Sequence, residues 1–133
     1  MKDCIFCKIV KGEIPAYKIY EDEKTLAFLD INPLTRGHAL VIPKKHVEDI
    51  FEIESGDLSM VIRVVQKVAQ SLRENLGASG INLFQANKPV AGQEVFHLHF
   101  HVVPRYQNDK IEAWPESDYQ EKDFEAVAKK IRI

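Results

Sequence analysis

The sequence has few cysteines, little excess charge and no long hydrophobic run, and each shortage excludes a class of protein. Two cysteines in 133 residues are too few for a disulfide framework. A formal net charge of −2 argues against strong nonspecific binding to nucleic acid. No stretch approaches the ~20 apolar residues of a membrane span, and the N-terminus has no apolar run long enough for a signal peptide. We therefore expect a cytoplasmic protein with neither nucleic acid nor membrane as a partner.

The composition is that of an ordinary globular protein. Of all residues, 45% are hydrophobic and 29% are charged, and the chain is long enough to bury a sizeable core. Nothing in it indicates a second domain. We expect one domain over residues 1–133, with 107–133 forming a C-terminal tail and a closing helix.

Three of the five histidines stand at alternate positions in the stretch 97–103, which reads HLHFHVV. Because successive side chains of a strand point to opposite faces, His97, His99 and His101 share one face, and apolar residues occupy the other. A His-x-His pair on a strand can also chelate zinc with a third histidine. The triplet alone therefore does not separate a metallohydrolase from metal-free chemistry.

A polar loop over residues 87–94, NKPVAGQE, leads into the histidines and suits an anion. Together, the histidine stretch and Ala91-Gly92-Gln93 resemble the signature of the histidine triad (HIT) nucleotide-binding proteins. The resemblance covers most of residues 4–106. It also includes the upstream segments IFCKI (5–9), EIP (13–15), AFLDI (27–31) and GHALVIPKKH (37–46).

The resemblance implies a nucleotide site. In it, Asp30 accepts the ribose hydroxyls, although an isolated aspartate after a strand would by default cap a turn. The slot for the base is formed by the apolar residues Phe6, Ile9, Phe28 and Ile31, and Ile5 and Asn32 line its edges. In the polar loop, Asn87, Gly92 and Gln93 contact the phosphate.

The resemblance also assigns the chemistry. His99 is the nucleophile that forms a nucleotidyl-histidine, and His101 donates to the phosphate with help from Gln93, without a catalytic metal. It implies a hydrolase of purine nucleoside 5′-phosphoramidates or related nucleotidyl compounds, with AMP or GMP derivatives as substrates. Two alternatives stay open: asymmetric hydrolysis of diadenosine polyphosphates, and a nucleotide-binding regulatory protein with incidental turnover.

Two departures from the family pattern bear on the leaving group. Glu94 stands where many eukaryotic relatives have Ser or Thr, and a carboxylate near a phosphate repels it unless it is turned away or protonated. Pro104-Arg105 stands in place of paired glycines, so hydrolysis of diadenosine polyphosphates stays an open alternative.

Cys4-x-x-Cys7 has the spacing of half a zinc site and needs two more ligands. A thioredoxin-type redox role and idle reduced thiols, with His46 making a hydrogen bond, are the competing interpretations. The candidate further ligands are His46 and His97. The resemblance implies a closed structural zinc site formed by Cys4, Cys7, His46 and His97.

The remaining patterns predict an α+β fold with an antiparallel sheet of about five strands. We expect strands over 17–21, 25–29, 38–42, 80–85 and 97–103. A long amphipathic helix over 58–76, with Ser55 as N-cap and Gly77 after its end, packs on one face, and a short helix closes the chain. His38 is interpreted as structural. The resemblance adds a homodimer with the long helix at its interface, in which Trp114 either anchors the tail or helps select the leaving group.

Overall fold

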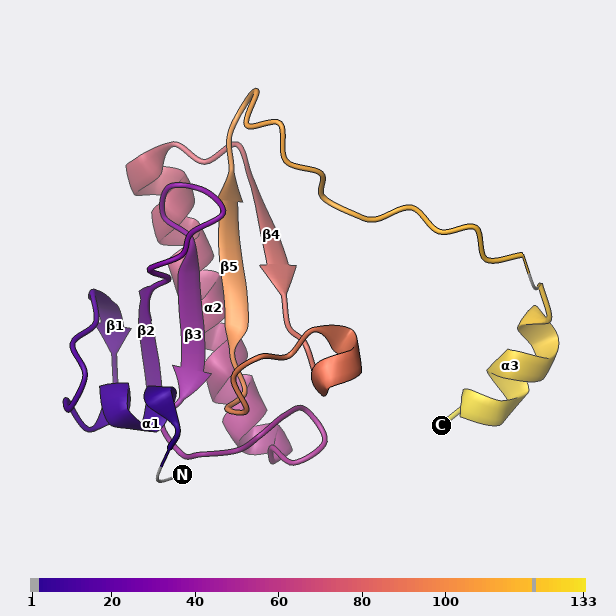
Figure 1. The fold of residues 1–133 in the computed structure, drawn as a ribbon, viewed down its shortest axis with the longest axis horizontal. Coiled ribbons are helices and arrows are strands. Elements are labelled where there is room, and N and C mark those ends of the chain that lie inside the picture. The colour runs from indigo at the N-terminus through magenta and orange to yellow at the C-terminus, as the bar shows by residue number, and fades with distance from the viewer. Residues whose placement is uncertain (1–2, 121) are drawn as a thin grey trace.

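The computed structural model describes residues 3–120 and 122–133, shown as a ribbon in Figure 1. It confirms the α+β fold. Its elements are α1 (Ile5–Val10), β1 (Lys18–Glu21), β2 (Thr25–Leu29), β3 (Ala39–Pro43), α2 (Ser55–Leu76), β4 (Gly80–Phe84), a 3₁₀ turn at Pro89–Ala91, β5 (Phe100–Arg105) and α3 (Phe124–Ile131).

The five strands form one antiparallel sheet in the order β1-β2-β3-β5-β4. The last strand in sequence, β5, is therefore inserted between β3 and β4 (Figure 1). In this register His101 pairs with Leu40 on one side and with Phe84 on the other. The insertion makes β5, which carries His101, an internal strand of the sheet.

A helix packs on each face of the sheet, and alternate apolar side chains of β2 and β3 point to the two faces. One set, which includes Ala27 and Val41, packs against the buried face of α2, and the other, which includes Phe28 and Leu40, packs against α1. Val102 belongs to the α2 side. The histidines at 97, 99 and 101 therefore face away from α2, as the alternation predicts.

Helix α2 is the long amphipathic helix that the sequence predicts, but it starts differently. It begins at Ser55, and Glu54 occupies the N-cap position without a side-chain cap bond, so the prediction of Ser55 as N-cap was wrong. Its C-cap, Gly77, has a φ of 70°, as expected for a glycine that turns left-handed.

Three further elements differ from the sequence-based expectation. Strand β5 begins at Phe100 rather than His97, so the first histidines precede the regular ladder. Helix α1 was not predicted, because it has six residues and its N-cap is Cys4, which is not a usual capping residue. Helix α3 forms, but it has no buried residue and projects away from the sheet (Figure 1), so it does not close the fold.

In residues 3–120 and 122–133 there is no helix with both the length and the apolarity that crossing a bilayer requires.

Candidate active site

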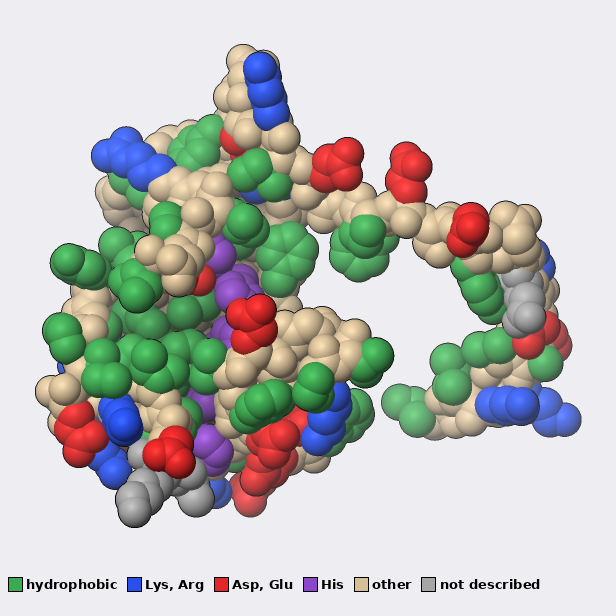
Figure 2. Space-filling view, viewed as in Figure 1, with side chains coloured by type: hydrophobic (Ala, Val, Ile, Leu, Met, Phe, Trp, Pro, Cys, Tyr) green, Lys and Arg blue, Asp and Glu red, His purple; other side chains and the backbone are tan. Residues whose placement is uncertain are grey.

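A cavity of about 770 Å³ lies between α1, the end of β2 and the segment that leads into β5. This volume suits a nucleotide-sized ligand. In Figure 2, histidine side chains surface in a hollow beside apolar side chains, with an acidic side chain near them. Ten of the twelve residues predicted to bind nucleotide line the cavity: Ile5, Phe6, Ile9, Phe28, Asp30, Ile31, Asn32, Gly92, His99 and His101.

The backbone fixes the tautomer of His99. Its Nδ1 lies 2.8 Å from the carbonyl oxygen of His97. A carbonyl only accepts, so Nδ1 carries the proton and donates it, and Nε2 keeps its lone pair. His99 thus offers an unprotonated ring nitrogen, which is what a nucleophile at phosphorus needs.

A second backbone contact sets the tautomers of His38 and His101. The amide N–H of Leu34 donates to His38 Nδ1 at 3.0 Å, so His38 carries its proton on Nε2. That nitrogen lies 2.9 Å from His101 Nδ1 and donates to it. His101 therefore carries its own proton on Nε2, which makes this nitrogen a hydrogen-bond donor.

Asp30 stands beside this pair, one residue after β2 ends. Its Oδ1 accepts from the amide of Asn32 at 2.8 Å and caps the turn, which was the default expectation for an isolated aspartate. Its Oδ2 lies 3.5 Å from His38 Nε2 and 4.0 Å from His101 Nδ1. The carboxylate can therefore stabilise a proton on the histidine pair while it lines the cavity.

Burial keeps these imidazoles neutral. It lowers the pKa of His38 and of His99, and it lowers the pKa of His101 to about 4, with a smaller contribution from the neighbouring His99 and His38. Asp30 opposes the shift in all three. At neutral pH the site therefore holds uncharged rings, consistent with the tautomers that the backbone sets.

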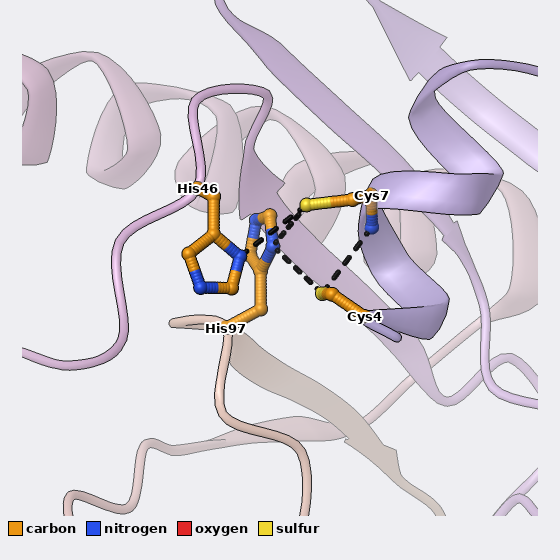
Figure 3. A group of neighbouring side chains, drawn as sticks. All are labelled: Cys4, Cys7, His46 and His97. Atoms are coloured by element: carbon orange, nitrogen blue, oxygen red, sulfur yellow. Dashed lines mark hydrogen bonds between the residues drawn. The ribbon is translucent and has the colours of Figure 1, made fainter. Parts of the chain in front are cut away.

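Four side chains from three separate segments meet at a second site, drawn in Figure 3. Cys4 Sγ lies 3.4 Å from His97 Nδ1, and Cys7 Sγ lies 3.3 Å from His46 Nδ1 and 3.6 Å from His97 Nδ1. Zinc bonds of ordinary length in a tetrahedron separate sulfur and nitrogen ligands by roughly 3.5 Å. The predicted set of Cys4, Cys7, His46 and His97 thus forms a candidate zinc site.

The chemistry of these donors also fits a metal ion. His97 is fully buried, and its Nε2 donates to the carbonyl of Pro43 at 2.8 Å, which leaves Nδ1 unprotonated toward the sulfurs. Such an outer hydrogen bond commonly orients a ligating histidine. Burial lowers the pKa of His97 to about 4 and raises the pKa of the Cys7 thiol. The imidazole is thus ready to ligate, and a bound cation would deprotonate the thiol.

Phe6 connects the two sites physically. Its ring makes edge contacts with His97 and His99, with centroid distances of 5.9 and 5.1 Å, and it also contacts Phe28. Because Phe6 lies between Cys4 and Cys7 in sequence, whatever fixes the cysteines also fixes this ring against His99.

Two predicted site residues do not reach the cavity wall. Gln93 is buried: its Oε1 accepts from the amide of Lys88, and its Nε2 donates to the carbonyls of Glu48 and Val95. Asn87 bonds to the amide of Ile50 and to the side chain of Gln85. Here both side chains hold the loop in shape instead of facing a phosphate.

His38 is the site residue that sequence reasoning missed. It directly precedes β3, and it becomes a neighbour of His101 only because β3 pairs with β5. Because side chains two residues apart in a strand share a face, the sequence could have placed His38 on the same face as Leu40. Its contact with His101, however, depends on a strand pairing between residues more than 60 positions apart.

The structure defines the class as small α+β domains in which neutral histidines line a cavity of about 770 Å³. Comparison with known proteins narrows the class: a family model described as the HIT domain matches residues 11–108. The chain belongs to the HIT family.

Two relatives match nearly the whole chain. An "uncharacterized HIT-like protein" of Methanocaldococcus jannaschii is 48% identical over 97% of this chain and 98% of its own length. An enzyme of Schizosaccharomyces pombe named adenosine 5′-monophosphoramidase is 38% identical over 96% of this chain and 95% of its own length.

Solved structures agree with the fold. The crystal structure of a HIT family member from Bacillus subtilis has a TM-score of 0.88 at 40% identity, covering 98% of this chain and 97% of that one. A zinc-bound histidine triad protein from Mycobacterium smegmatis has a TM-score of 0.81 at 44% identity, covering 88% and 85%.

Proposed function

We propose that this protein hydrolyses purine nucleoside 5′-phosphoramidates, such as AMP joined to an amine, through a covalent nucleotidyl intermediate on His99. The observation that carries the proposal is the hydrogen bond from His99 Nδ1 to the His97 carbonyl, because it leaves Nε2 free as a nucleophile. The name of the S. pombe relative supports the choice of substrate.

The reaction proceeds in two displacements. His99 Nε2 attacks the α-phosphorus and the phosphorus–nitrogen bond breaks. When the substrate binds, the His38–His101 pair takes up a proton from solvent, because Asp30 and the anionic phosphoryl group stabilise its protonated form, and the pair gives this proton to the amine as it leaves. Water then attacks the same phosphorus, the bond to His99 breaks, and the proton of that water returns to the pair. The products are a nucleoside monophosphate and a free amine.

The cavity supports the binding of the nucleotide part. In our proposal the base lies in the apolar slot that includes Phe6, Ile9 and Phe28, and the ribose hydroxyls donate to Asp30. With Gln93 and Asn87 engaged inside their loop, His101 Nε2–H is the side-chain donor that we assign to the phosphoryl oxygens. Reorientation of Gln93 on binding would add another.

We also propose that the candidate metal site holds zinc with a structural role. A site with four protein ligands has no open position for substrate, as is usual for structural zinc. Bound there, the ion supplies a crosslink between α1, the segment after β3 and the start of the histidine row. The zinc-bound relative from M. smegmatis supports this choice of metal.

The assembly that we propose is a homodimer. Strand β4 ends the sheet and leaves one edge open to another strand, and Leu83 on it is about half exposed. Met60 and Ile62 on α2 and Trp114 in the tail are exposed apolar side chains that a second copy could cover. Light scattering at micromolar concentration should give twice the monomer mass, and a monomer would overturn the proposal.

The activity is tested by AMP release from adenosine 5′-phosphoramidate, with intact mass recorded during turnover. Wild type should release AMP and show a transient added AMP, and a folded His99→Ala variant should do neither. Equal rates in both proteins would refute the nucleophilic role of His99. AMP binding without turnover of any nucleotidyl compound would favour a regulatory role, and turnover of diadenosine polyphosphates alone would favour that alternative.

A further inference from the structure

In the part of the chain that the structure describes, the cavity wall has no cationic side chain that would balance the charge of a nucleotide. Among its lining residues, all within the part of the chain that the structure describes, there is neither lysine nor arginine. The formal charges there are two carboxylates, Asp30 and Glu94. A substrate with several negative charges is therefore opposed by the field of its own site.

The nearby loop does not supply the missing charge. Lys88 is its single lysine, and the ammonium lies 2.7 Å from a carboxylate oxygen of buried Asp49 and 4.0 Å from one of Glu48. Those two acids already neutralise it. The polar loop thus brings to the cavity one uncompensated charge, which is the negative charge of Glu94.

Glu94 differs from Asp30 in having no internal partner. Asp30 accepts from a backbone amide and lies beside His38. Within residues 3–120 and 122–133, by contrast, the Glu94 carboxylate takes part in no hydrogen bond or ion pair. It is exposed and lines the cavity together with Ala91 and Gly92. A free carboxylate on a cavity wall is available to a ligand.

The position of Glu94 indicates which part of the substrate it faces. One part of the wall, formed by α1, the end of β2 and residues 30–32 and 34, takes the base and ribose in the proposed function. A second part is formed by residues 84–86, 91, 92, 94 and 95. With the α-phosphorus at His99, the leaving group extends toward this second part.

We infer that Glu94 makes the enzyme selective for phosphoramidates whose leaving amine carries a second, positively charged group. This inference rests on the proposed function and narrows its substrate class. The Glu94 carboxylate pairs with the cationic end of the amine and repels leaving groups that end in carboxylate, sulfate or further phosphates. Glu94 is thus a specificity-determining residue that contacts the leaving group.

Three adenosine 5′-phosphoramidates of matched length test the inference: N-(2-aminoethyl), N-propyl and N-(2-carboxyethyl). Unit charges roughly 7 Å apart at an intermediate dielectric change kcat/KM by about fivefold to tenfold. Wild type should therefore prefer the aminoethyl over the propyl compound by about that factor and disfavour the carboxyethyl compound equally. High salt should compress both ratios.

The variant Glu94→Gln keeps the shape and removes the charge, so both ratios should move to about one. Glu74→Gln, at an exposed position on α2, is the matched control and should keep the wild-type ratios. Ratios in Glu94→Gln within twofold of wild type would overturn the inference.

The neutral N-propyl compound separates this inference from the proposed function. If it is hydrolysed but the two kcat/KM ratios are the same in wild type and Glu94→Gln, only the inference fails. If none of the three is hydrolysed, the proposed function fails, and calorimetric Kd values for the same compounds decide the charge preference. Equal Kd values in wild type and Glu94→Gln for all three would then overturn the inference as well.

Discussion

If the site of Cys4, Cys7, His46 and His97 holds zinc as we propose, removing the ion should release α1 from the sheet while the rest of the domain stays folded. Cys4 and Cys7 hold this short helix against His46 and His97, which belong to segments far away in sequence. A chelator that takes the ion from this site removes that link. The sheet and α2 retain their own core, which does not depend on α1.

The size of the effect follows from the burial of the helix. Phe6 and Ile9 are its large buried side chains, and at full burial they contribute together about 5 kcal/mol. Ordering the six residues of α1 costs about 9 kcal/mol. The shortfall of about 4 kcal/mol lies well within the roughly 10–16 kcal/mol that a structural zinc ion can supply.

Native-state hydrogen exchange measures this balance directly. The amides of Lys8 and Lys11 donate to Cys4 and Cys7 carbonyls at 3.1 Å and report whether the helix is formed. Without the ion, an unfavourable balance of about 4 kcal/mol leaves α1 unfolded in nearly all molecules, so these amides should lose their protection and exchange at nearly the unprotected rate, while amides in β3 should change far less. Nucleotide affinity should fall in parallel, because α1 forms part of the base slot.

The double variant Cys4→Ser, Cys7→Ser is the control: it should lack protection in α1 from the start and be insensitive to chelator. Metal content is measured on the same samples. If the ion is gone and the protection of Lys8 and Lys11 stays within about threefold, the reasoning is refuted, because α1 would then be held by packing alone.

Three other perturbations test the remaining features. Burial lowers the pKa of His101 in the folded protein to about 4. As the pH falls below about 6.5, the unfolded state therefore binds more protons than the folded state. His101 alone should lower the free energy of unfolding by about 2 kcal/mol at pH 5. Urea unfolding of His101→Gln should lack this part of the pH dependence. Gly37→Ala should destabilise by about 2–3 kcal/mol, because Gly37 has a φ of 94° and a Cβ there would lie 2.7 Å from Leu76 Cδ1. Asp30→Asn should weaken AMP binding, measured as Kd, by roughly 10–100-fold, as expected for a lost hydrogen bond to a charged group, and leave the Kd of 2′,3′-dideoxy AMP almost unaffected.

Each of these predictions has an outcome that contradicts it. The His101 account fails if His101→Gln shows the same loss of stability between pH 7 and 5 as wild type. The steric account of Gly37 fails if Gly12→Ala costs as much, since Gly12 has a similar φ of 79° but open space around it. The ribose role of Asp30 fails if AMP and 2′,3′-dideoxy AMP lose affinity equally in Asp30→Asn.

Local patterns were sufficient for much of this protein. The period-2 alternation around residues 97–103 predicted which histidines share a face, even though the regular strand starts only at Phe100. The 3.6-residue periodicity and Gly77 predicted α2. These features depend on neighbours a few residues apart, whose geometry the backbone fixes. The spacing of Cys4 and Cys7 likewise predicted half of a metal site.

Other features depend on contacts between distant segments. His38 contacts His101 only through the pairing of β3 with β5, and Gln93 turns inward, where its amide donates to the distant backbone carbonyl of Glu48. The sequence alone supplied the residue types and their local spacing, and with them the family resemblance. The tertiary structure decided which nitrogen of His38, His97, His99 and His101 carries the proton, which polar side chains reach the cavity and that Glu94 remains unpaired there, because hydrogen-bond partners are chosen by proximity in space.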